Sequence, residues 1–325
     1  MVKREVRYHT DNRQITSRPS SGYRSYCNVL CMIHYSFNLV KPTDSGNVRY
    51  VTCSKIHPNS DQFQTYDPAW GNHRLSVIVP YRGAFDELLL FVPHLHKFLN
   101  ARMVRHKICI IHQVDNYRFN RGFLINIGFL LSRDKFDYMV MHDIDLLPVN
   151  PLLNYSYPDE GPYHLSSPEY HPQYGGKRFI GGVLLFTMKD FAKVQGMTNG
   201  DWGWGGEDNE LYTRIRLSKL KLTRASGLTT GRKTFMNIHD VSKRPRDKER
   251  FDTVKGNQFK LDSEYGFSNA KYNLQRVVAM EIDDAPVTIY NVELQCDVTK
   301  TPWCQTNYTV ADYKSRRNIK NKDSD

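Results

Sequence analysis

The sequence of 325 residues is 40% hydrophobic and 12% aromatic, enough for one large α/β domain with a short appendage or for two ordinary domains. Its 45 lysines and arginines exceed its 34 acidic residues, which gives a net charge of +11. We expect no nucleic-acid partner, because the sequence contains no zinc-finger or RNP-type pattern. The charge favours solubility or an anion-attracting surface, and small anionic substrates or acidic polymers explain it equally well.

Residues 1–72 are polar, rich in Ser, Asn and Arg, and show no sustained periodicity, which predicts a poorly ordered extension or stem. The best candidate for a transmembrane helix, residues 29–40, is too short and is interrupted by polar residues. Residues 1–9 carry charges where a signal peptide has its apolar region. We therefore expect that, if the protein works in the secretory pathway, its membrane anchor is missing from this chain.

Cysteines and glycosylation sequons bear on the cellular compartment. Cys296 and Cys304 flank a short segment that a disulfide could close, whereas Cys109 lies in an apolar run that is typical of a buried free thiol. No C-x-x-C zinc pattern occurs. The sequons that begin at Asn154 and Asn307 are compatible with a secretory compartment.

From residue 73 on, buried strands alternate with amphipathic helices. Apolar runs at 75–79, 108–111 and 138–142 predict strands, and apolar residues at 3.6-residue spacing predict helices over 85–99 and 123–131. Pro93 predicts a kink or a break in the first helix. This rhythm predicts an α/β fold with a mostly parallel, Rossmann-like sheet. The absence of G-x-G-x-x-G and G-x-x-x-x-G-K-[ST] disfavours a dinucleotide dehydrogenase and a P-loop phosphotransferase.

The third strand runs into Asp143-Ile144-Asp145, two carboxylates separated by one residue. Ligands of open α/β sheets lie beyond the carboxyl ends of the strands, and carboxylates buried there need a cation or hydrogen bonds. Oxygen ligands suit Mg²⁺ or Mn²⁺, which commonly share substrate phosphates. The pattern favours a nucleotide-diphosphate site that holds a divalent ion, although a solvated turn after a strand also carries aspartates.

A second dense site follows a surface segment rich in Pro, Tyr, Gly and His at 155–176 and a strand predicted at 181–186. It reads Asp201-Trp-Gly-Trp-Gly-Gly-Glu-Asp-Asn-Glu210 and opens a helix with an acidic first turn. Helix capping explains the acids, and core packing explains Trp202 and Trp204, without any function. Glycines that alternate with tryptophans also predict a mobile loop whose flat aromatic faces bind sugar rings. Residues 243–250 are basic and predict a solvated stretch.

Seven motifs from both sites and their surroundings occur in one order. They are Val79-Pro-Tyr-Arg82, Phe119-Asn-Arg121, Met141-His-Asp-Ile-Asp-Leu-Leu-Pro148, Gly181-Gly182, Trp202-Gly-Trp-Gly-Gly-Glu-Asp208, His239-Asp240 and Thr301-Pro-Trp-Cys304. In order and spacing the sequence resembles the β-1,4-galactosyltransferase family, and within it the members that act on xylosylated proteins. The resemblance implies a catalytic domain at 73–305 and a basic tail at 306–325, while residues 1–72 show no such likeness.

The resemblance implies the GT-A nucleotide-sugar-binding α/β fold, with a less regular acceptor-binding half. It also implies a Mn²⁺-dependent, inverting transfer of galactose from UDP-galactose to O4 of xylose on proteoglycan core proteins. The partners are then a nucleotide sugar and a xylosylated core protein. By resemblance the protein works in the Golgi lumen, where the family's members carry an N-terminal membrane anchor.

The resemblance also assigns roles to individual residues. The donor would bind at Pro80, Tyr81, Arg82, Phe119, Arg121, Asp143 and Trp204. The acceptor would bind at Tyr174, Trp204, Asp208 and Asn209, with Asp208 as the catalytic base. The metal would be held by Asp145, His239 and Asn237, and Arg250 matches a further position linked to function.

Five positions depart from the family pattern. Asn237 replaces a histidine ligand, Asn209 an aspartate, Phe179 and Gly176 tyrosines, and Ala84 an arginine. Two alternatives therefore stay open. One is the same fold with a different sugar donor or acceptor, and the other is a catalytically weakened sugar- or nucleotide-binding relative.

Overall fold

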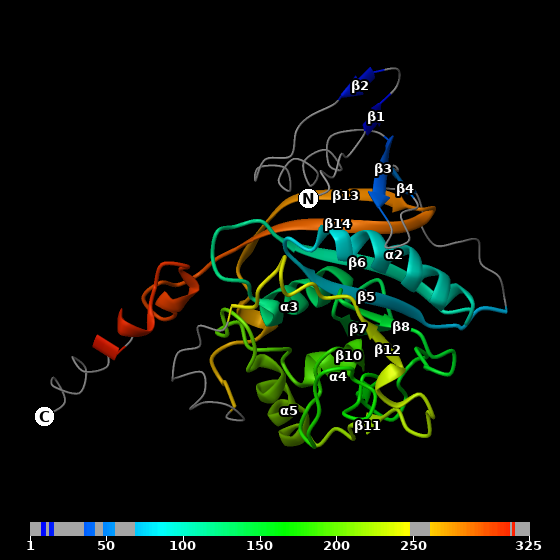
Figure 1. Ribbon diagram of the computed structural model, residues 1–325. Helices are drawn as coiled ribbons and strands as arrows, with labels where there is room; N and C mark the ends of the chain where they lie inside the picture. Colours follow the sequence, from blue (N-terminus) through cyan, green and yellow to red (C-terminus); the bar gives the residue numbers. More distant parts are fainter. Residues whose placement is uncertain are drawn as a thin grey trace, which may run out of the picture.

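The computed structural model describes residues 69–247, 261–312 and 314–315, and upstream of them the strand segments 8–10, 13–15, 36–42 and 48–55. Figure 1 shows a large sheet with the helices α2 (Phe85–Asn100) and α3 (Arg121–Ser132) packed against it. The two helices belong to two separate buried apolar cores, which cover opposite faces of the central strands. The fold is thus a layered α/β architecture.

The central strand β5 (Arg74–Tyr81) shows how the two cores arise from sequence. Val77 and Val79 pack into the core that contains α2, whereas Ile78 packs into the core that contains α3. β5 runs parallel to β6 (Arg105–Gln113) and to β7 (Tyr138–His142), and β14 (Ala285–Leu294) runs parallel to β6. Strands that are covered on both faces are expected to be continuous apolar runs. The three predicted strands are confirmed.

Both predicted helices are confirmed as well. The side chain of Asn120 accepts a hydrogen bond from the Phe123 N–H at 2.9 Å and so starts α3 at Arg121. A Cβ on Gly128 would lie 2.3 Å from Ile78 Cγ2, so glycine lets α3 approach β5 closely. Pro93 predicted a kink or a break, and the break is wrong, because α2 is one continuous helix with Pro93 inside it. The buried apolar side of this helix offsets the lost hydrogen bond.

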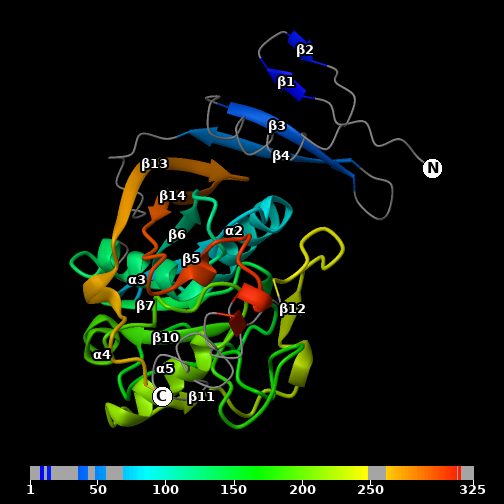
Figure 2. The same ribbon diagram turned by 90° about the vertical axis from the view of Figure 1, so that its left-hand side faces the viewer.

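Strands that pair antiparallel with its two edges extend this parallel centre, as Figure 2 shows from the side. On one side lie β10 (Val183–Thr187), β9 (Tyr163–His164) and β11 (Thr223–Arg224), with β10 antiparallel to β7. On the other side lie β13 (Tyr272–Ile282), β4 (Val48–Lys55), β3 (Ser36–Pro42), β1 (Tyr8–Thr10) and β2 (Arg13–Ile15). The sheet is therefore mixed, and the predicted parallel arrangement holds for its central four strands.

Shorter elements complete the molecule, most of them below the sheet in Figure 1. They are β8 (Leu146–Pro148) paired with β12 (Phe235–Asn237), the helices α4 (Met188–Lys193) and α5 (Glu207–Leu217), and the 3-10 turns η1 (Gly231–Lys233), η2 (Phe267–Asn269) and η3 (Pro302–Cys304). Long irregular segments connect them, as predicted for the acceptor-binding half. None of the helices among the described residues could cross a membrane.

The cysteines are arranged largely as expected. Cys296 and Cys304 form a disulfide, and Cys109 is a buried free thiol.

Upstream, β4 pairs with β13, so residues before the predicted domain start at 73 take part in the sheet. That domain boundary and the basic tail at 306–325 stay predictions.

Candidate active site

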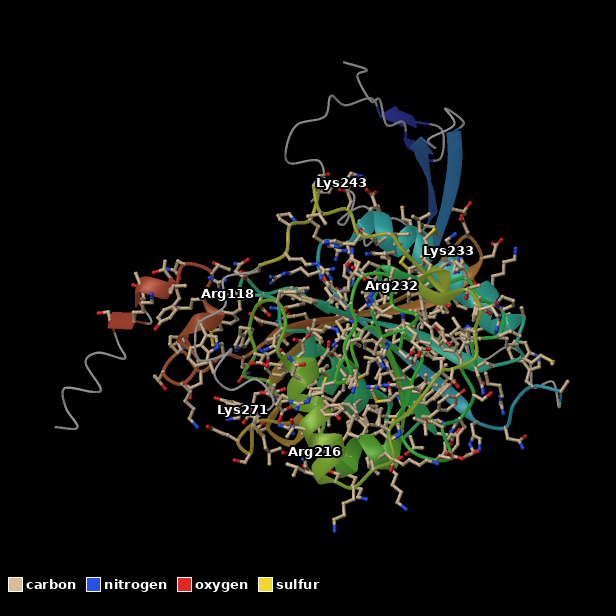
Figure 3. The ribbon with its side chains drawn as sticks, turned by 60° about the horizontal axis from the view of Figure 1, so that its bottom comes forward. Arg118, Arg216, Arg232, Lys233, Lys243 and Lys271 are labelled. Carbon is tan, nitrogen blue, oxygen red and sulfur yellow. A yellow bond between two sulfur atoms is a disulfide. The ribbon has the colours of Figure 1, made fainter. Side chains whose placement is uncertain are left out.

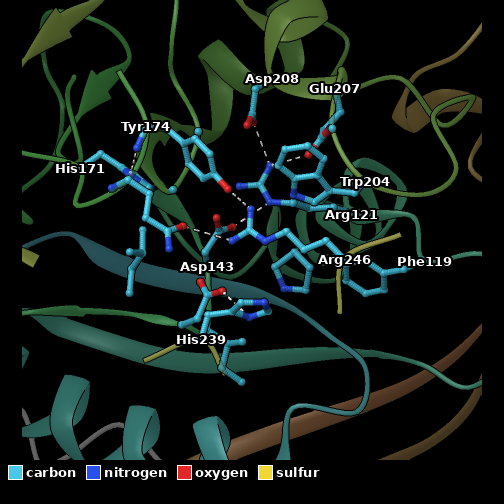
Figure 4. A pocket seen from close by; sticks show the side chains of 18 of the residues that line it. Phe119, Arg121, Asp143, His171, Tyr174, Trp204, Glu207, Asp208, His239 and Arg246 are labelled. Atoms are coloured by element: carbon cyan, nitrogen blue, oxygen red, sulfur yellow. Dashed lines mark hydrogen bonds and ion pairs between the residues drawn. The ribbon is translucent and has the colours of Figure 1, made fainter. Parts of the chain in front are cut away.

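A cavity of about 490 Å³ opens at the carboxyl ends of β5 and β7, where α/β sheets bind their ligands. Six parts of the chain surround it. These are the end of β5, the start of α3, the segment from the end of β7 into β8, and the segments 171–182, 203–209 and 237–247. Figure 4 shows the acidic, aromatic and basic side chains that meet there. The two dense sequence sites thus share one cavity.

Asp145 and His239 meet because β8 pairs with β12. The antiparallel register places Leu146 opposite Asn237, and the Ile238 N–H donates to the carbonyl oxygen of Asp145 at 2.8 Å. His239 Nδ1 therefore lies 3.3 Å from Asp145 Oδ2, and the guanidinium of Arg244 lies 3.8 Å from the same oxygen. Burial by itself raises the pKa of Asp145, but the His239 hydrogen bond and the Arg244 charge lower it below its ordinary value.

These residues fit a divalent cation. His239 Nε2 is buried and has no hydrogen-bond partner among the described residues, which is the state of a nitrogen available to a metal. Asp145 supplies a carboxylate oxygen beside it. Asn237 Oδ1 accepts a hydrogen bond from the backbone N–H of His239 at 2.9 Å. Because an amide oxygen has two lone pairs, the second one can still bind a metal. A protein site with only these three donors leaves coordination positions for phosphate oxygens or water.

Arg121, the first residue of α3, is the hub of the acidic cluster. Its guanidinium lies 2.8 Å from Asp143 Oδ1, 3.0 Å from Asp208 Oδ1 and 3.6 Å from Glu207 Oε1. Figure 4 shows the guanidinium pointing toward these carboxylates. Because its side chain is only 12% exposed, these charges interact through protein rather than through bulk water. Although burial by itself lowers the pKa of Arg121, the carboxylates raise it above its ordinary value, so this cation is permanent.

The acids around Arg121 differ in protonation. Burial and the neighbouring Asp208 charge together raise the pKa of Glu207 to about 8, against the opposing charge of Arg121. Burial also raises the pKa of Asp143 to about 6 against the opposing charge of Arg121. Glu210, in contrast, faces away from the cavity and forms an ion pair with Arg214 at 2.6 Å. At neutral pH Glu207 is therefore mostly protonated.

Glycine makes room for Asp208. A Cβ on Gly181 would lie 2.3 Å from Asp208 Oδ2 and 2.9 Å from Phe179 Cε2. The Gly181-Gly182 pair before β10 is thus the surface against which the acid and the aromatic ring pack. Any larger side chain at Gly181 would push Asp208 out of its place.

Aromatic side chains form the other wall. The ring centroids of Tyr174 and Trp204 are 6.2 Å apart, and those of Tyr174 and Phe179 are 5.9 Å apart. Trp204 is 39% exposed, whereas Trp202 is buried and packs edge-on against Phe123. Trp202 is thus a core residue and Trp204 a pocket residue. The glycine between the two tryptophans allows one side chain to point into the core and the other toward the cavity.

The segment after His239 was missed as part of the site. Arg246 lies over the rings of Tyr174 and Trp204 at 5.3 and 5.2 Å and donates a hydrogen bond to the Tyr174 hydroxyl. Arg244 donates to Glu87 at 2.9 Å and also lines the cavity. The prediction of a solvated basic stretch is therefore wrong for these two arginines. His171 and Gln173 are further lining residues that the sequence motifs did not single out.

The cavity brings together nearly all of the predicted site residues. Those that line it are Pro80, Arg82, Phe119, Arg121, Asp143, Asp145, Tyr174, Trp204, Asp208, Asn209, Asn237 and His239. Tyr81 is the exception, because its side chain is 3% exposed, belongs to the core that contains α2, and packs edge-on against His112. Arg250 lies outside the described residues.

Comparison with known proteins agrees with this geometry. Residues 38–157 match the family model described as the N-terminal region of glycosyl transferase group 7, and residues 161–240 match the model described as the N-terminal domain of galactosyltransferase. The first match starts upstream of residue 73, so the likeness extends further toward the N-terminus than the motifs indicated.

Individual relatives cover most of the chain. A mouse protein named β-1,4-galactosyltransferase 7 is 49% identical over 298 residues, which is 88% of this chain and 91% of the relative. The xylosylprotein 4-β-galactosyltransferase of Caenorhabditis elegans is 45% identical over 72% of this chain and 83% of its own. The solved catalytic domain of Drosophila β-1,4-galactosyltransferase 7 in complex with xylobiose is 45% identical, with a TM-score of 0.70, and covers 72% of this chain and 100% of its own.

The second solved structure is a mutant of the Drosophila enzyme in complex with manganese, UDP-Gal and xylobiose, again with a TM-score of 0.70. The fold and the cavity define a glycosyltransferase of the GT-A type. At this identity and coverage, the chain belongs to the β-1,4-galactosyltransferase family.

Proposed function

We propose that the protein transfers galactose from UDP-galactose to O4 of a xylose on a proteoglycan core protein, with Mn²⁺ as cofactor and inversion at the anomeric carbon. One observation carries the proposal. Asp145 and Asp208, which come from two distant parts of the chain, line the same cavity, and Asp143 and Arg121 connect them. A metal-and-donor site and a base therefore face a single reaction space.

The donor half of the cavity would hold UDP-galactose. Pro80, Arg82 and Phe119 form the side nearest β5, and Arg82 lies over the Phe119 ring at 5.7 Å. Asp145, His239 and Asn237 would hold Mn²⁺, which when bound supplies a Lewis acid for the departing diphosphate. Asp143 is fixed by Arg121 and would orient the nucleoside rather than bind the metal.

In the acceptor half, Asp208 would accept the proton of the attacking hydroxyl. Arg121 holds its Oδ1, which leaves Oδ2, beside Gly181, to receive that proton. The neighbouring Glu207 is mostly neutral at pH 7 and is therefore not poised to accept a proton. Tyr174 and Trp204 would stack on the sugar ring. Direct attack from the face opposite the leaving group inverts the anomeric centre, and no covalent enzyme intermediate is needed.

The departures from the family pattern have distinct surroundings. Phe179 packs edge-on against His171 without a hydroxyl to donate, and Ala84 is fully buried at the start of α2. Asn209 lines the cavity beside Asp208 as a neutral group. The observation that favours the weakened-relative alternative is that Asn237 offers an uncharged amide oxygen, one lone pair of which already accepts the backbone N–H of His239.

A turnover assay tests the proposal. UDP release from UDP-galactose is measured with an aryl β-xyloside, with and without Mn²⁺, for the wild type and for Asp208→Asn. General-base catalysis contributes about 10²–10⁴-fold, so a loss of this size in Asp208→Asn is expected. Asp134→Asn is the matched control, because the Asp134 side chain is 84% exposed and does not line the cavity. The absence of metal-dependent UDP release, or full activity in Asp208→Asn, would refute the assignment.

We also propose a Golgi location with a membrane anchor. The Cys296–Cys304 disulfide supports an oxidising compartment. The exposed sequon at Asn154 is compatible with it.

A further inference from the structure

Three exposed basic residues lie at, or close in sequence to, the part of the cavity lining that contains Tyr174 and Gly175: Arg232, its neighbour Lys233, and Lys177, and we call them the cationic rim. Arg232 Nη2 lies 3.6 Å from the Cβ position of Gly175, a cavity-lining residue, and Arg232 Nη1 lies 3.4 Å from the Pro172 carbonyl oxygen. Lys177 follows Gly175 by two residues. Figure 3 shows Arg232 and Lys233 together, on the same turn η1.

The rim residues lack the acidic partners that some other basic surface residues have. Lys221 pairs with Glu160 at 2.6 Å, and Lys243 pairs with Asp86 at 2.9 Å. In the described part of the chain, no carboxylate lies within ion-pair distance of the three rim residues, and Arg232 bonds only to a backbone carbonyl. Their positive charge is therefore uncompensated and attracts anions.

Neighbouring contacts lead from the base to the rim. Asp208 Oδ2 and the Phe179 ring both pack at Gly181, the Phe179 ring lies 5.9 Å from Tyr174, and Tyr174 precedes Gly175, against which Arg232 lies. In a xylopyranose, C4 and C1 are at opposite ends of the ring. When O4 faces Asp208, C1 and the polypeptide attached to it therefore point away from the base.

We infer that the cationic rim binds acidic side chains that flank the xylosylated residue of the acceptor polypeptide. The inference rests on the proposed function and specifies its substrate. An extended peptide advances about 3.3–3.6 Å per residue, so acids within a few positions of the attachment site can reach the rim. An exposed ion pair changes affinity by at most about fivefold, so we expect the three together to change KM by about 3- to 30-fold.

The test compares three acceptors and three proteins. The acceptors are a xylosylated peptide with Asp and Glu flanks, the same peptide with Asn and Gln flanks, and an uncharged aryl β-xyloside. The rim variant carries Lys177→Gln, Arg232→Gln and Lys233→Gln. The control variant removes the same charge elsewhere and carries Arg216→Gln, Lys219→Gln and Lys271→Gln. Figure 3 shows Arg216 and Lys271 away from Arg232 and Lys233, and Lys219 follows Arg216 by three residues.

The wild type and the control variant should show a lower KM for the acidic peptide than for the amide peptide, by about 3- to 30-fold at low salt. The rim variant should lose this preference and keep its KM for the aryl xyloside. Added salt should weaken the preference, because exposed charges are screened.

Several results would overturn the inference. Equal KM values for the two peptides in the wild type would do so, as would a rim variant whose KM rises as much for the aryl xyloside as for the acidic peptide. An oligonucleotide that competes as strongly as the acidic peptide, with competition lost in the rim variant, would assign the rim to polyanions in general. If no protein turns over the aryl xyloside, the proposed function fails instead, and fluorescence polarisation with the acidic and amide peptides then tests the rim by itself.

Discussion

Removing the guanidinium at the centre of the acidic cluster should destabilise the protein. Arg121→Met leaves Asp143 and Asp208, at 2.8 and 3.0 Å in the native site, without their shared cation. Breaking a buried ion pair costs about 3–5 kcal/mol, and we expect about 3 kcal/mol because the two carboxylate side chains keep 31% and 25% exposure. For a domain of this size, that loss lowers the melting temperature by about 6–12 °C.

The assay is thermal unfolding at pH 7, followed by the same measurement at pH 5. Because the stranded carboxylates become protonated on acidification, the difference between Arg121→Met and the wild type should shrink at the lower pH. Asp143→Asn is the matched second substitution. In the Arg121→Met background it should cost less than in the wild type, with a coupling of about 1–3 kcal/mol. A melting temperature within about 2 °C of the wild type, or additive effects of the two substitutions, would refute the network.

Three further predictions concern groups around and beyond the cavity. In the folded state the pKa of Glu207 is about 8, against an ordinary value of 4.5, so the folded protein holds this proton more tightly than the unfolded chain and stability falls as pH rises between these values. Glu207→Gln should therefore make the melting temperature fall less between pH 5 and pH 8. An unchanged dependence on pH would contradict this. Arg246→Ala should lower the KM for an aryl β-xyloside by about 2- to 10-fold, because the sugar then no longer has to displace the guanidinium from the rings of Tyr174 and Trp204. A raised KM would show instead that Arg246 binds the acceptor. Replacing Cys296 and Cys304 by serine opens a loop with a sequence separation of 8 and should cost about 2.5 kcal/mol in denaturant unfolding, and an unchanged midpoint would argue against this contribution.

The centre of the fold is predictable because it is covered on both faces. β5, β6 and β7 are short apolar runs, and the helices between them have one apolar side, so period and length identify each element. The antiparallel pairing of β10 with β7 could not be predicted from the sequence, because an apolar run has the same composition in either direction. Only the path of the chain between the two strands decides their direction.

Within the site, the dense acidic and aromatic motifs were sufficient to identify most of the lining residues. Tyr81 was misplaced, although the alternation of β5 puts it on the same face as Val77 and Val79, which face the core that contains α2. Arg246 could not be identified as a site residue in this way, because the sequence of a basic segment does not reveal whether its side chains are solvated or packed over aromatic rings. What places it is a tertiary contact, in which the Trp204 N–H donates to the Asp247 carbonyl oxygen at 3.1 Å.

The pairing of β4 with β13 has a practical consequence for recombinant work. Cys53 on β4 is fully buried among the residues of the core that contains α2, and Thr52 exchanges backbone and side-chain hydrogen bonds with Asp283 at the end of β13. A truncated protein that starts at residue 73 would expose this edge of β13, and a bared edge strand recruits strands from other molecules. Crystallisation and assay trials should therefore start from a chain that keeps residues 48–55, since the shorter version is expected to aggregate.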